Sequence, residues 1–393
     1  MKAKIKEILF KGVEEIIEKE SLLKKLKSGK KLRIKHGIDP TGPKIHLGRA
    51  SVLWKLRAFQ NLGHQIVLII GDFTAQIGDA SDKTAMRRPL SDKEIKENME
   101  DYIGQINKIL NVKKVELHYN SKWLNKLTMH DLLSLAMKFT AQQMIQRRNF
   151  KERWDEGKPI GVHELLYPLF QGYDSVMVKA DIEIGGTDQL FNLKVGREIQ
   201  KMFNQSPQDI ITFKMLLGLD GEKMSTTRGN VINITDKPND IYGKIMSMKD
   251  GLIGDYFELT TPLPLEEIEK IKKELKNKEV NPRDLKAKLA RTIVNLYYNE
   301  KTAEEAEREF NRIFKEKKLP SEILVFKTKK KIYPLLDLLF DSKLVSSKSE
   351  AKRIVLQGGV KINEKVEKDW RKKVEIKKGM VIQIGKRKFL KIG

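Results

Sequence analysis

The stretch GIDPTGPKIHLGRA, at residues 37–50, decides how this chain folds. An apolar strand pattern over 32–38 ends in it, and a helical pattern runs from Ala50 to Leu62 directly after it. Prolines and glycines at a strand-to-helix junction predict a tight turn that a ligand can approach closely. The N-terminus of a helix offers free N–H groups and a partial positive charge. We therefore hypothesise that this turn binds the phosphates of ATP.

Strand and helix patterns alternate outward from this turn to about residue 235. The apolar run QIVLIIGD predicts a strand buried on both faces, and further strands are expected in KVELHYN, ADIEIGG and DIITFKMLLG. Helices are expected over 92–110, 128–150 and 188–203, and one or two more within 1–30. This alternation predicts an α/β fold with a parallel sheet, in which ligands bind at the carboxyl ends of the strands.

The pattern changes twice after this α/β part. Residues 238–318 read as helices punctuated by prolines, and the last segment reads as two short helices followed by antiparallel strands. Ser347 to Glu350 has the form of a capping box. The sequence thus predicts four parts: a catalytic domain (1–236), a helical domain (237–320), a linker (321–331) and a small α+β domain (332–393).

Composition narrows the classes of partner. The chain has 77 Lys and Arg against 53 Asp and Glu, a net charge of +24. Residues 331–393 alone hold 17 basic and 7 acidic side chains, which favours a nucleic acid as partner there. A lysine-rich solvated surface would produce the same overall balance.

The same composition excludes other classes. There are no cysteines, so disulfides and Cys-ligated zinc are excluded. No apolar run approaches the roughly 20 residues of a membrane span, and no signal peptide is recognisable. We expect a cytoplasmic protein that does not bind membranes. The six scattered histidines form no HxxxH pair, so no protein-bound metal is expected.

Two further motifs carry chemistry. KMSTT, at 223–227, lies in the glycine-rich segment GLDGEKMSTTRGN and brings a lysine that can reach a phosphate. Tyr167, Gln171 and Asp174 share one face of a predicted helix and precede GGTDQ at 185–189. Such a polar stripe suits a small zwitterion, although a solvated helix face would show the same residues. For KMSTT the alternative is a solvated basic hairpin.

Together these motifs resemble those of the bacterial-type tyrosyl-tRNA synthetases of class I. HLGR resembles the family's HIGH motif, KMSTT resembles KMSKS, and the Tyr167 stripe with GGTDQ resembles the tyrosine pocket. SKSEAKRIVLQGGVKIN, from residue 347, resembles an S4-type RNA-binding domain. The resemblance covers nearly the whole chain from Leu32 and implies a Rossmann-like catalytic domain.

The resemblance also implies an activity and partners. The enzyme would be a tyrosine–tRNA ligase that joins L-tyrosine to ATP as tyrosyl-adenylate, with Mg²⁺ on the phosphates, and then charges tRNA(Tyr). A homodimer is implied, with an interface near 120–170 and Met137, Phe139 and Met144 as contacts. A tryptophanyl-tRNA synthetase and a degenerate paralogue that only binds RNA stay open as alternatives.

Site residues follow from the family's motifs. The implied tyrosine site consists of Asp79, Tyr167, Gln171, Asp174 and Gln189. Asp174 would accept from the phenol hydroxyl, and Gln189 would lie near the substrate carboxylate. Implied contacts to the ATP come from Asp39, Gly48, Asp188 and Lys223. Implied catalytic groups on the leaving phosphates are Thr41, His46, Lys83, Arg87 and Lys223.

Three positions depart from the family pattern. Arg49 replaces the final histidine of HIGH, and Thr226 and Thr227 leave KMSKS without its second lysine. Either Arg49 or Arg228 is a candidate for the missing cation. Lys35 stands where many relatives carry a tyrosine that shares the phenol hydroxyl, so the role of this lysine is open.

Overall fold

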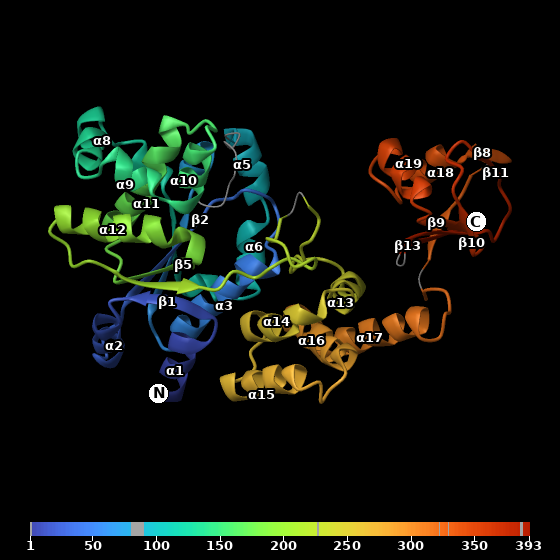
Figure 1. The fold of residues 1–393 in the computed structure, drawn as a ribbon, viewed down its shortest axis with the longest axis horizontal. Helices are drawn as coiled ribbons and strands as arrows, with labels where there is room; N and C mark the ends of the chain where they lie inside the picture. The colour runs from blue at the N-terminus through green and yellow to red at the C-terminus, as the bar shows by residue number, and fades with distance from the viewer. Residues whose placement is uncertain (1, 80–89, 226–227, 322, 329, 386–387) are drawn as a thin grey trace. The chain divides into compact units, whose positions relative to one another are not determined.

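The structure, a computed structural model, describes residues 2–79, 90–225, 228–321, 323–328, 330–385 and 388–393 (Figure 1). Its contacts divide the chain into two compact units. The first comprises residues 1–237 and 244–299, and the second comprises 238–243 and 300–393. The four parts expected from the sequence differ in their pattern of helices and strands, whereas the two units differ in which residues contact one another. The borders of the four parts stay predictions.

A six-stranded sheet organises the first unit, in the order β1-β6-β5-β2-β3-β4. The strands are β1 Val13–Ile17, β2 Arg33–Ile38, β3 Gln65–Ile70, β4 Val115–Tyr119, β5 Ile182–Gly186 and β6 Asp209–Phe213. The strands β2 to β6 are parallel, and each coincides with a predicted strand. The predicted α/β fold class is confirmed.

The edge strand β1 was missed, since residues 1–30 were expected to be helical only. It runs antiparallel to β6, between α1 (Lys2–Phe10) and α2 (Lys19–Lys27). Gly12 and Glu18 have positive φ angles of 63° and 65° and separate the strand from both helices. Its hydrogen-bond partner lies about 200 residues away, so no local pattern could reveal the pairing.

Helices cover the sheet and follow its strands (Figure 1). They are α3 Leu47–Asn61, α4 Thr74–Ile77, α5 Asp92–Met99, α6 Tyr102–Asn107, α7 Ser121–Leu124, α8 Met129–Ala136, α9 Ala141–Ile145, α10 Arg148–Asp155, α11 Val162–Met177 and α12 Leu190–Met202. Two helices expected to be continuous are divided. The helix expected over 128–150 begins at the capping box of Thr128, but a second capping box at Thr140 begins a new helix within it.

Further helices complete the first unit and begin the second. They are α13 Pro238–Met246, α14 Ile253–Thr260, α15 Leu265–Lys276, α16 Pro282–Tyr297 and α17 Glu300–Phe314. Pro238 and Pro282 each occupy the first turn of a helix, where a missing N–H has no cost.

The C-terminal part of the second unit packs two helices against short strands. The helices are α18 Leu335–Asp341 and α19 Lys348–Leu356. The strands are β7 Leu324–Phe326, β8 Ile332–Pro334, β9 Val360–Ile362, β10 Lys365–Glu367, β11 Lys373–Glu375, β12 Val381–Ile384 and β13 Lys388–Ile392. One core, extending from Tyr333 to Ile392, is built from this segment alone.

Two local details differ from expectation in this part. β7 lies within the expected linker and pairs in parallel with β13. Ser347 caps α19 as predicted by accepting from the N–H of Glu350, but the Glu350 carboxylate accepts from the backbone N–H and hydroxyl of Ser346. In a capping box the Glu350 carboxylate would accept from the N–H of the N-cap residue, Ser347; here it accepts from the preceding residue instead.

Candidate active site

The opening turn leads from β2 to α3, and His46 is the residue before the first turn of the helix. Its Nδ1 is buried without a hydrogen-bond partner. Burial and, secondarily, the charge of Arg49 lower the pKa of His46 to about 3. The imidazole is therefore neutral at pH 7. Gly48 lies over it, since a methyl group at Gly48 would stand 3.1 Å from His46 Nδ1.

The turn is joined to the KMSTT segment in two ways. The backbone of Ile45 and Leu47 pairs with Ile234 and Ile232, which follow that segment. Met224 Sδ would lie 3.3 Å from a methyl group at Gly48. The two motifs, which are almost 180 residues apart in sequence, are thus in contact.

Helices α5 and α6 brace the turn with side chains that the sequence did not single out. Asn98 Nδ2 donates to the Pro40 carbonyl at 2.9 Å. Gln105 is buried and holds the turn twice, since its Oε1 accepts from Ile45 N and its Nε2 donates to Pro43 O, both at 2.8 Å. Because these bonds fix the backbone, the turn keeps one shape.

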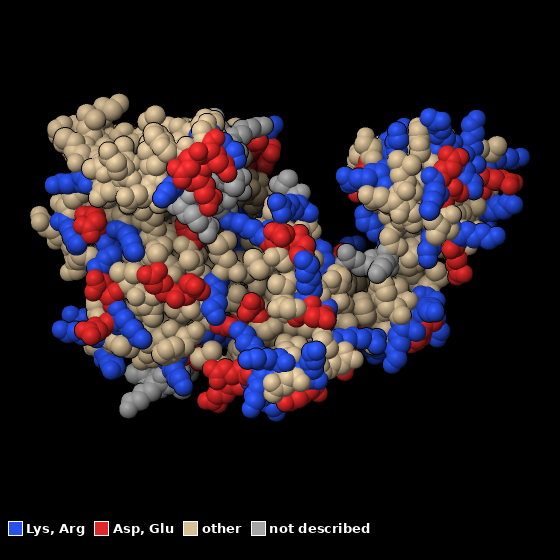
Figure 2. Space-filling model, in the orientation of Figure 1, with Lys and Arg blue, Asp and Glu red and all other residues tan. Residues whose placement is uncertain are grey.

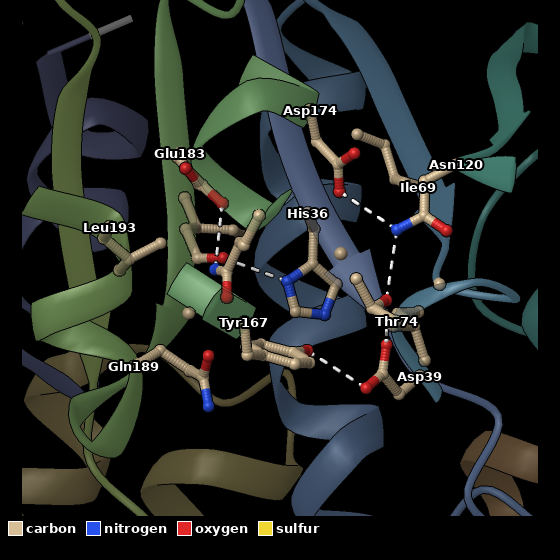
Figure 3. Close-up of a pocket in the computed structure, with 16 residues that line it drawn as sticks. His36, Asp39, Ile69, Thr74, Asn120, Tyr167, Asp174, Glu183, Gln189 and Leu193 are labelled. Carbon is tan, nitrogen blue, oxygen red and sulfur yellow. Dashed lines mark hydrogen bonds between the residues drawn. The ribbon is translucent and has the colours of Figure 1, made fainter. Parts of the chain in front are cut away.

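A pocket opens at the carboxyl ends of β2 and β5 (Figure 3). β2 lies inside the sheet, with β5 on one side of it and β3 on the other. Five of the expected site residues line the pocket: Asp39, Tyr167, Gln171, Asp174 and Gln189. This is the edge at which an open parallel sheet binds ligands. The structure therefore brings together residues from β2, α11 and the segment after β5.

Asp39 is the first residue after β2, and both oxygens of its carboxylate accept hydrogen bonds. Its carboxylate accepts from Tyr167 Oη at 3.0 Å and from Thr74 Oγ1 at 2.8 Å. Burial, and then the charges of Asp39 and Asp79, raise the pKa of Tyr167, so the phenol stays a donor. A methyl group at Gly71 would collide with both Asp39 and Thr74. Only glycine fits there.

Asp174 is a buried carboxylate held by two donors from the segment after β4. Trp123 Nε1 donates to Oδ1 at 2.7 Å, and Asn120 Nδ2 donates to Oδ2 at 3.3 Å. Burial raises the pKa of Asp174 to about 7, although the charge of Lys35 and the two hydrogen bonds oppose the shift. Asn120 also donates to Thr74 Oγ1 at 3.1 Å. A chain of hydrogen bonds therefore runs from Asp174 to Asp39.

A second chain of polar contacts connects the remaining tyrosine-site residues. Gln189 Nε2 donates to Asp79 Oδ2 at 2.6 Å, and Arg147 pairs with Asp79 Oδ1 at 3.2 Å. Asn192 Nδ2 donates to Gln171 Oε1 at 2.9 Å and to Gln189 Oε1 at 3.2 Å. Arg147 and Asn192 belong to no motif, so no local sequence pattern indicates either residue.

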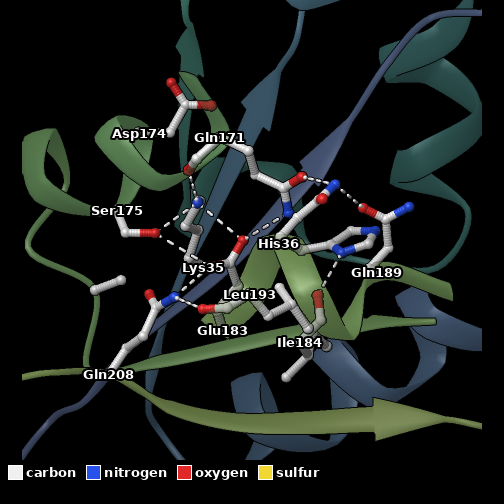
Figure 4. Close-up of polar contacts among 12 residues, drawn as sticks. Lys35, His36, Gln171, Asp174, Ser175, Glu183, Ile184, Gln189, Leu193 and Gln208 are labelled. Atoms are coloured by element: carbon white, nitrogen blue, oxygen red, sulfur yellow. Dashed lines mark hydrogen bonds and ion pairs between the residues drawn. The ribbon is translucent and has the colours of Figure 1, made fainter. Parts of the chain in front are cut away.

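Lys35 does not belong to the pocket wall. Its side chain is fully buried, and its Nζ lies 2.8 Å from Oε1 of Glu183, which does line the pocket, and 2.7 Å from Ser175 Oγ (Figure 4). Gln208 donates to the other oxygen of Glu183. Lys35 is therefore one half of a fully partnered buried ion pair.

The neighbouring residue, His36, lines the pocket instead (Figure 3). Successive residues of a strand point to opposite faces, so the lysine and the histidine divide the two sides of β2. His36 Nδ1 lies 2.9 Å from the Ile184 carbonyl, and burial lowers its pKa. A neutral ring whose Nδ1–H donates to that carbonyl presents Nε2 as an acceptor.

The phosphate-binding residues expected from the loops are only partly described. Lys223 Nζ lies 3.6 Å from Asp188 Oδ2, which links the KMSTT segment to the segment after β5. Asn230 ties that segment together by donating to Lys223 O and accepting from Ser225 N. Lys83, Arg87, Thr226 and Thr227 lie outside the described residues.

Neither a metal cluster nor a membrane helix is found in the described part of the chain. Within it, no three His, Cys, Asp or Glu side chains come together as a metal site. No helix in the same residues has the length and apolar character needed to cross a membrane.

Comparison with known proteins identifies the class. The family described as tRNA synthetases class I (W and Y) matches residues 27–315, and the S4 domain matches 334–382. The chain is therefore a class I aminoacyl-tRNA synthetase. The tyrosine–tRNA ligase of Carboxydothermus hydrogenoformans is 47% identical over 98% of this chain and 97% of its own length. That of Thermotoga maritima is 45% identical over 98% and 96%. The chain belongs to the tyrosine–tRNA ligase family.

Solved structures agree with the fold. A tyrosyl-tRNA synthetase complexed with L-tyrosine from Archaeoglobus fulgidus has a TM-score of 0.63 at 22% identity, covering 77% of this chain and 99% of that one. A C-terminally truncated mitochondrial tyrosyl-tRNA synthetase from Aspergillus nidulans has a TM-score of 0.65 at 22% identity, covering 80% and 95%. The predicted family, fold and tyrosine–tRNA ligase activity are confirmed.

Proposed function

We propose that the pocket joins L-tyrosine to ATP as tyrosyl-adenylate, and that the chain then charges tRNA(Tyr). One observation carries the assignment of the site. A buried carboxylate, Asp174, lies at one end of the pocket and is connected through Asn120 and Thr74 to Asp39 at the opening turn. A phenol hydroxyl and an adenylate would meet the two ends of this chain of hydrogen bonds.

The tyrosine roles follow from chemistry and position. Asp174 accepts from the phenol hydroxyl, so phenylalanine would leave this buried carboxylate without its partner. The substrate ammonium is held by Asp79, Tyr167 and Gln171. Gln189 lies near the substrate carboxylate, where its hydrogen bond to Asp79 fixes its orientation.

The ATP roles lie along the opening turn. Asp39, Gly48 and Asp188 contact the adenosine side, and Thr41, His46 and Lys223 bind the leaving phosphates together with Lys83 and Arg87. The tyrosine carboxylate attacks the α-phosphorus in line, the bond to the β-phosphate oxygen breaks, and pyrophosphate leaves with the electron pair. The carboxylate is already ionised at pH 7, so positioning and charge stabilisation supply the catalysis.

Mg²⁺ enters this scheme as part of the substrate. This ion retains much of its water and is commonly bound through substrate phosphates with one or two carboxylates. The oxygen-rich surroundings of the opening turn, with Asp39 and Asp188, fit such an ion on ATP. When bound, it shields charge on the β- and γ-phosphates.

The C-terminal segment is the proposed tRNA-binding part. Figure 2 shows blue side chains spread densely over it, in line with its excess of Lys and Arg. Trp370 is flanked by Lys352 Nζ at 4.2 Å and Arg371 Cζ at 4.7 Å from its ring centroid. Clustered cations of this kind suit a phosphate backbone.

We also propose that the protein is a cytoplasmic homodimer. Met129 and Leu133 in α8 and Met137, its C-cap, are spaced by four residues and are 72%, 55% and 78% exposed. Of the contacts expected from the sequence, Met137 lies on this face, whereas Met144 is buried in the core. An exposed apolar stripe of this kind fits a second copy of the chain.

Pyrophosphate exchange with each of the twenty amino acids tests the activity. We expect exchange that depends on tyrosine and is at least about 10⁴-fold weaker with phenylalanine, an effect for which the tyrosyl enzyme is a known example. Exchange with tryptophan instead would favour the tryptophanyl alternative. If no amino acid supports exchange, the alternative of a degenerate paralogue that only binds RNA would be favoured.

A further inference from the structure

The side chain of Arg49 is anchored at the opening turn by two hydrogen bonds. Its Nη1 donates to Tyr102 Oη at 2.9 Å, and its Nη2 donates to Thr41 Oγ1. Thr41 is one of the residues proposed to bind the leaving phosphates. A permanent positive charge is thus fixed beside that hydroxyl, at the position that corresponds to the final histidine of the HIGH motif.

We propose that Arg49 is a catalytic residue that binds the leaving phosphates in place of the missing second lysine of the KMSTT segment, and that Tyr102 is its positioning residue. The inference rests on the proposed assignment of the opening turn as the ATP site. It adds a cation and a supporting hydroxyl that the family's motifs do not contain.

The guanidinium has donors left for a ligand. It carries five N–H groups, and the bonds to Thr41 and Tyr102 use two of them. A planar fork of donors suits phosphate oxygens and keeps its charge at every working pH. Arg49 therefore donates to the departing pyrophosphate as negative charge builds on it, without any proton transfer.

Tyr102 is built to hold this group. It lies on α6 with 0% exposure, so its ring is fixed by packing on all sides. The same pair of helices holds the turn backbone through Asn98 and Gln105. Helices α5 and α6 therefore position both the Arg49 side chain and the backbone of the turn.

Arg228, the other candidate cation, is placed differently. It is exposed at the end of the KMSTT segment, where its charge contributes to lowering the pKa of Asp220. Arg49 lies on the turn itself and, besides burial, its charge helps to keep His46 neutral. The fixed positive charge of the turn is therefore carried by Arg49.

A double-mutant cycle tests the pair. Arg49→Ala, Tyr102→Phe and the double variant are compared in tyrosine-dependent pyrophosphate exchange, with tyrosine and ATP varied separately. We expect Arg49→Ala to lower kcat by about 100-fold and Tyr102→Phe by about 10-fold, with the KM for tyrosine nearly unchanged. In the Arg49→Ala background, Tyr102→Phe should have no further effect.

Two further variants separate this role from a structural one. Arg49→Lys keeps the charge and should recover part of the loss in kcat. Tyr297→Phe is the matched control, because it removes the hydroxyl of another buried tyrosine, which accepts from Trp54 at 3.0 Å. It should leave kcat unchanged, and melting temperatures should show that all variants are folded.

Two results would overturn the proposal. One is equal loss from Tyr102→Phe in the presence and absence of Arg49. The other is an Arg49→Ala variant that retains full kcat. Failure of the ATP-site assignment itself gives a different pattern, because Lys223→Ala would then also leave kcat unchanged while wild-type exchange remains normal.

Discussion

At the residue scale, Asp174 combines two opposing demands. It must be buried to recognise a hydroxyl, yet burial disfavours its charged form and raises its pKa from 3.8 to about 7. The folded protein therefore holds a proton on this group between about pH 4 and 7 that the unfolded chain has lost. Stability supplied by the protonated form falls as pH rises through this window.

Asp174→Asn should remove this dependence on pH. We expect the free energy of unfolding of the variant, relative to wild type, to rise between pH 5 and pH 8 by up to about 3 kcal/mol. Tyrosine affinity should fall at the same time. Denaturant unfolding at several pH values measures the first effect; parallel curves for the two proteins would contradict the raised pKa.

Lys35 poses a different question at the same scale, because a buried ion pair is sensitive to the loss of one partner. Lys35→Met leaves Glu183 buried without its cation and should lower the free energy of unfolding by about 3–5 kcal/mol. Lys93→Met, which breaks the exposed pair with Glu97, should cost less than about 1 kcal/mol. Equal costs for the two variants would argue against the buried pair.

The sequence singled out those pocket residues that belong to a local pattern. Tyr167 and Asp174 were predicted because helical spacing places them on one face of α11. Asn120 and Tyr102 were not predicted, because they come from separate segments that only the folded sheet brings to the site. The role of Lys35 was left open by the sequence; in the fold it pairs with Glu183, and its neighbour His36 lines the pocket.

At the scale of elements, the expected strands were located well because apolar residues recur in each parallel strand, most continuously in β3, and helical patterns separate the strands. Helix boundaries were less accurate, since the region from 128 to 150 is divided into α8 and α9, which begin at threonine caps, and α10, which begins without a side-chain cap. The exposed stripe formed by Met129, Leu133 and Met137 belongs to α8 and its C-cap. This stripe can be tested directly.

Leu133→Glu combined with Met137→Glu places two charges on that face of α8. We expect the mass measured by light scattering during gel filtration to fall from a dimer to a monomer, since like charges would meet across the interface. Val366→Glu, at a 52% exposed position of the second unit, is the control and should leave the mass unchanged. A dimer that persists in the double variant would exclude α8 as the interface.

At the scale of the whole molecule, the two proposed activities belong to different parts of the chain. Every residue that lines the pocket lies between His36 and Leu193, within the first unit. The core from Tyr333 to Ile392 uses none of these residues. Adenylate formation and tRNA binding should therefore be separable.

Removal of residues 320–393 tests this separation, and the cut precedes β7 so that no strand is left without its partner. We expect tyrosine-dependent exchange to stay within about twofold of wild type. Charging of tRNA should fall by roughly 100-fold or more, because the basic side chains that contact phosphates are lost. If the shortened chain charges tRNA fully, the C-terminal segment is not part of the tRNA interface.

The edge strand β1 has a consequence for how the protein is made. Val13 pairs with Phe213, so the strand emerges from the ribosome about 200 residues before its partner. At ordinary synthesis rates that interval lasts about 10 to 40 s. The flanking helices, α1 and α2, have nine residues each and are too short to be stable alone. The segment from α1 to α2 of each nascent chain therefore stays exposed to proteases and chaperones until β6 has been synthesised and can pair with β1.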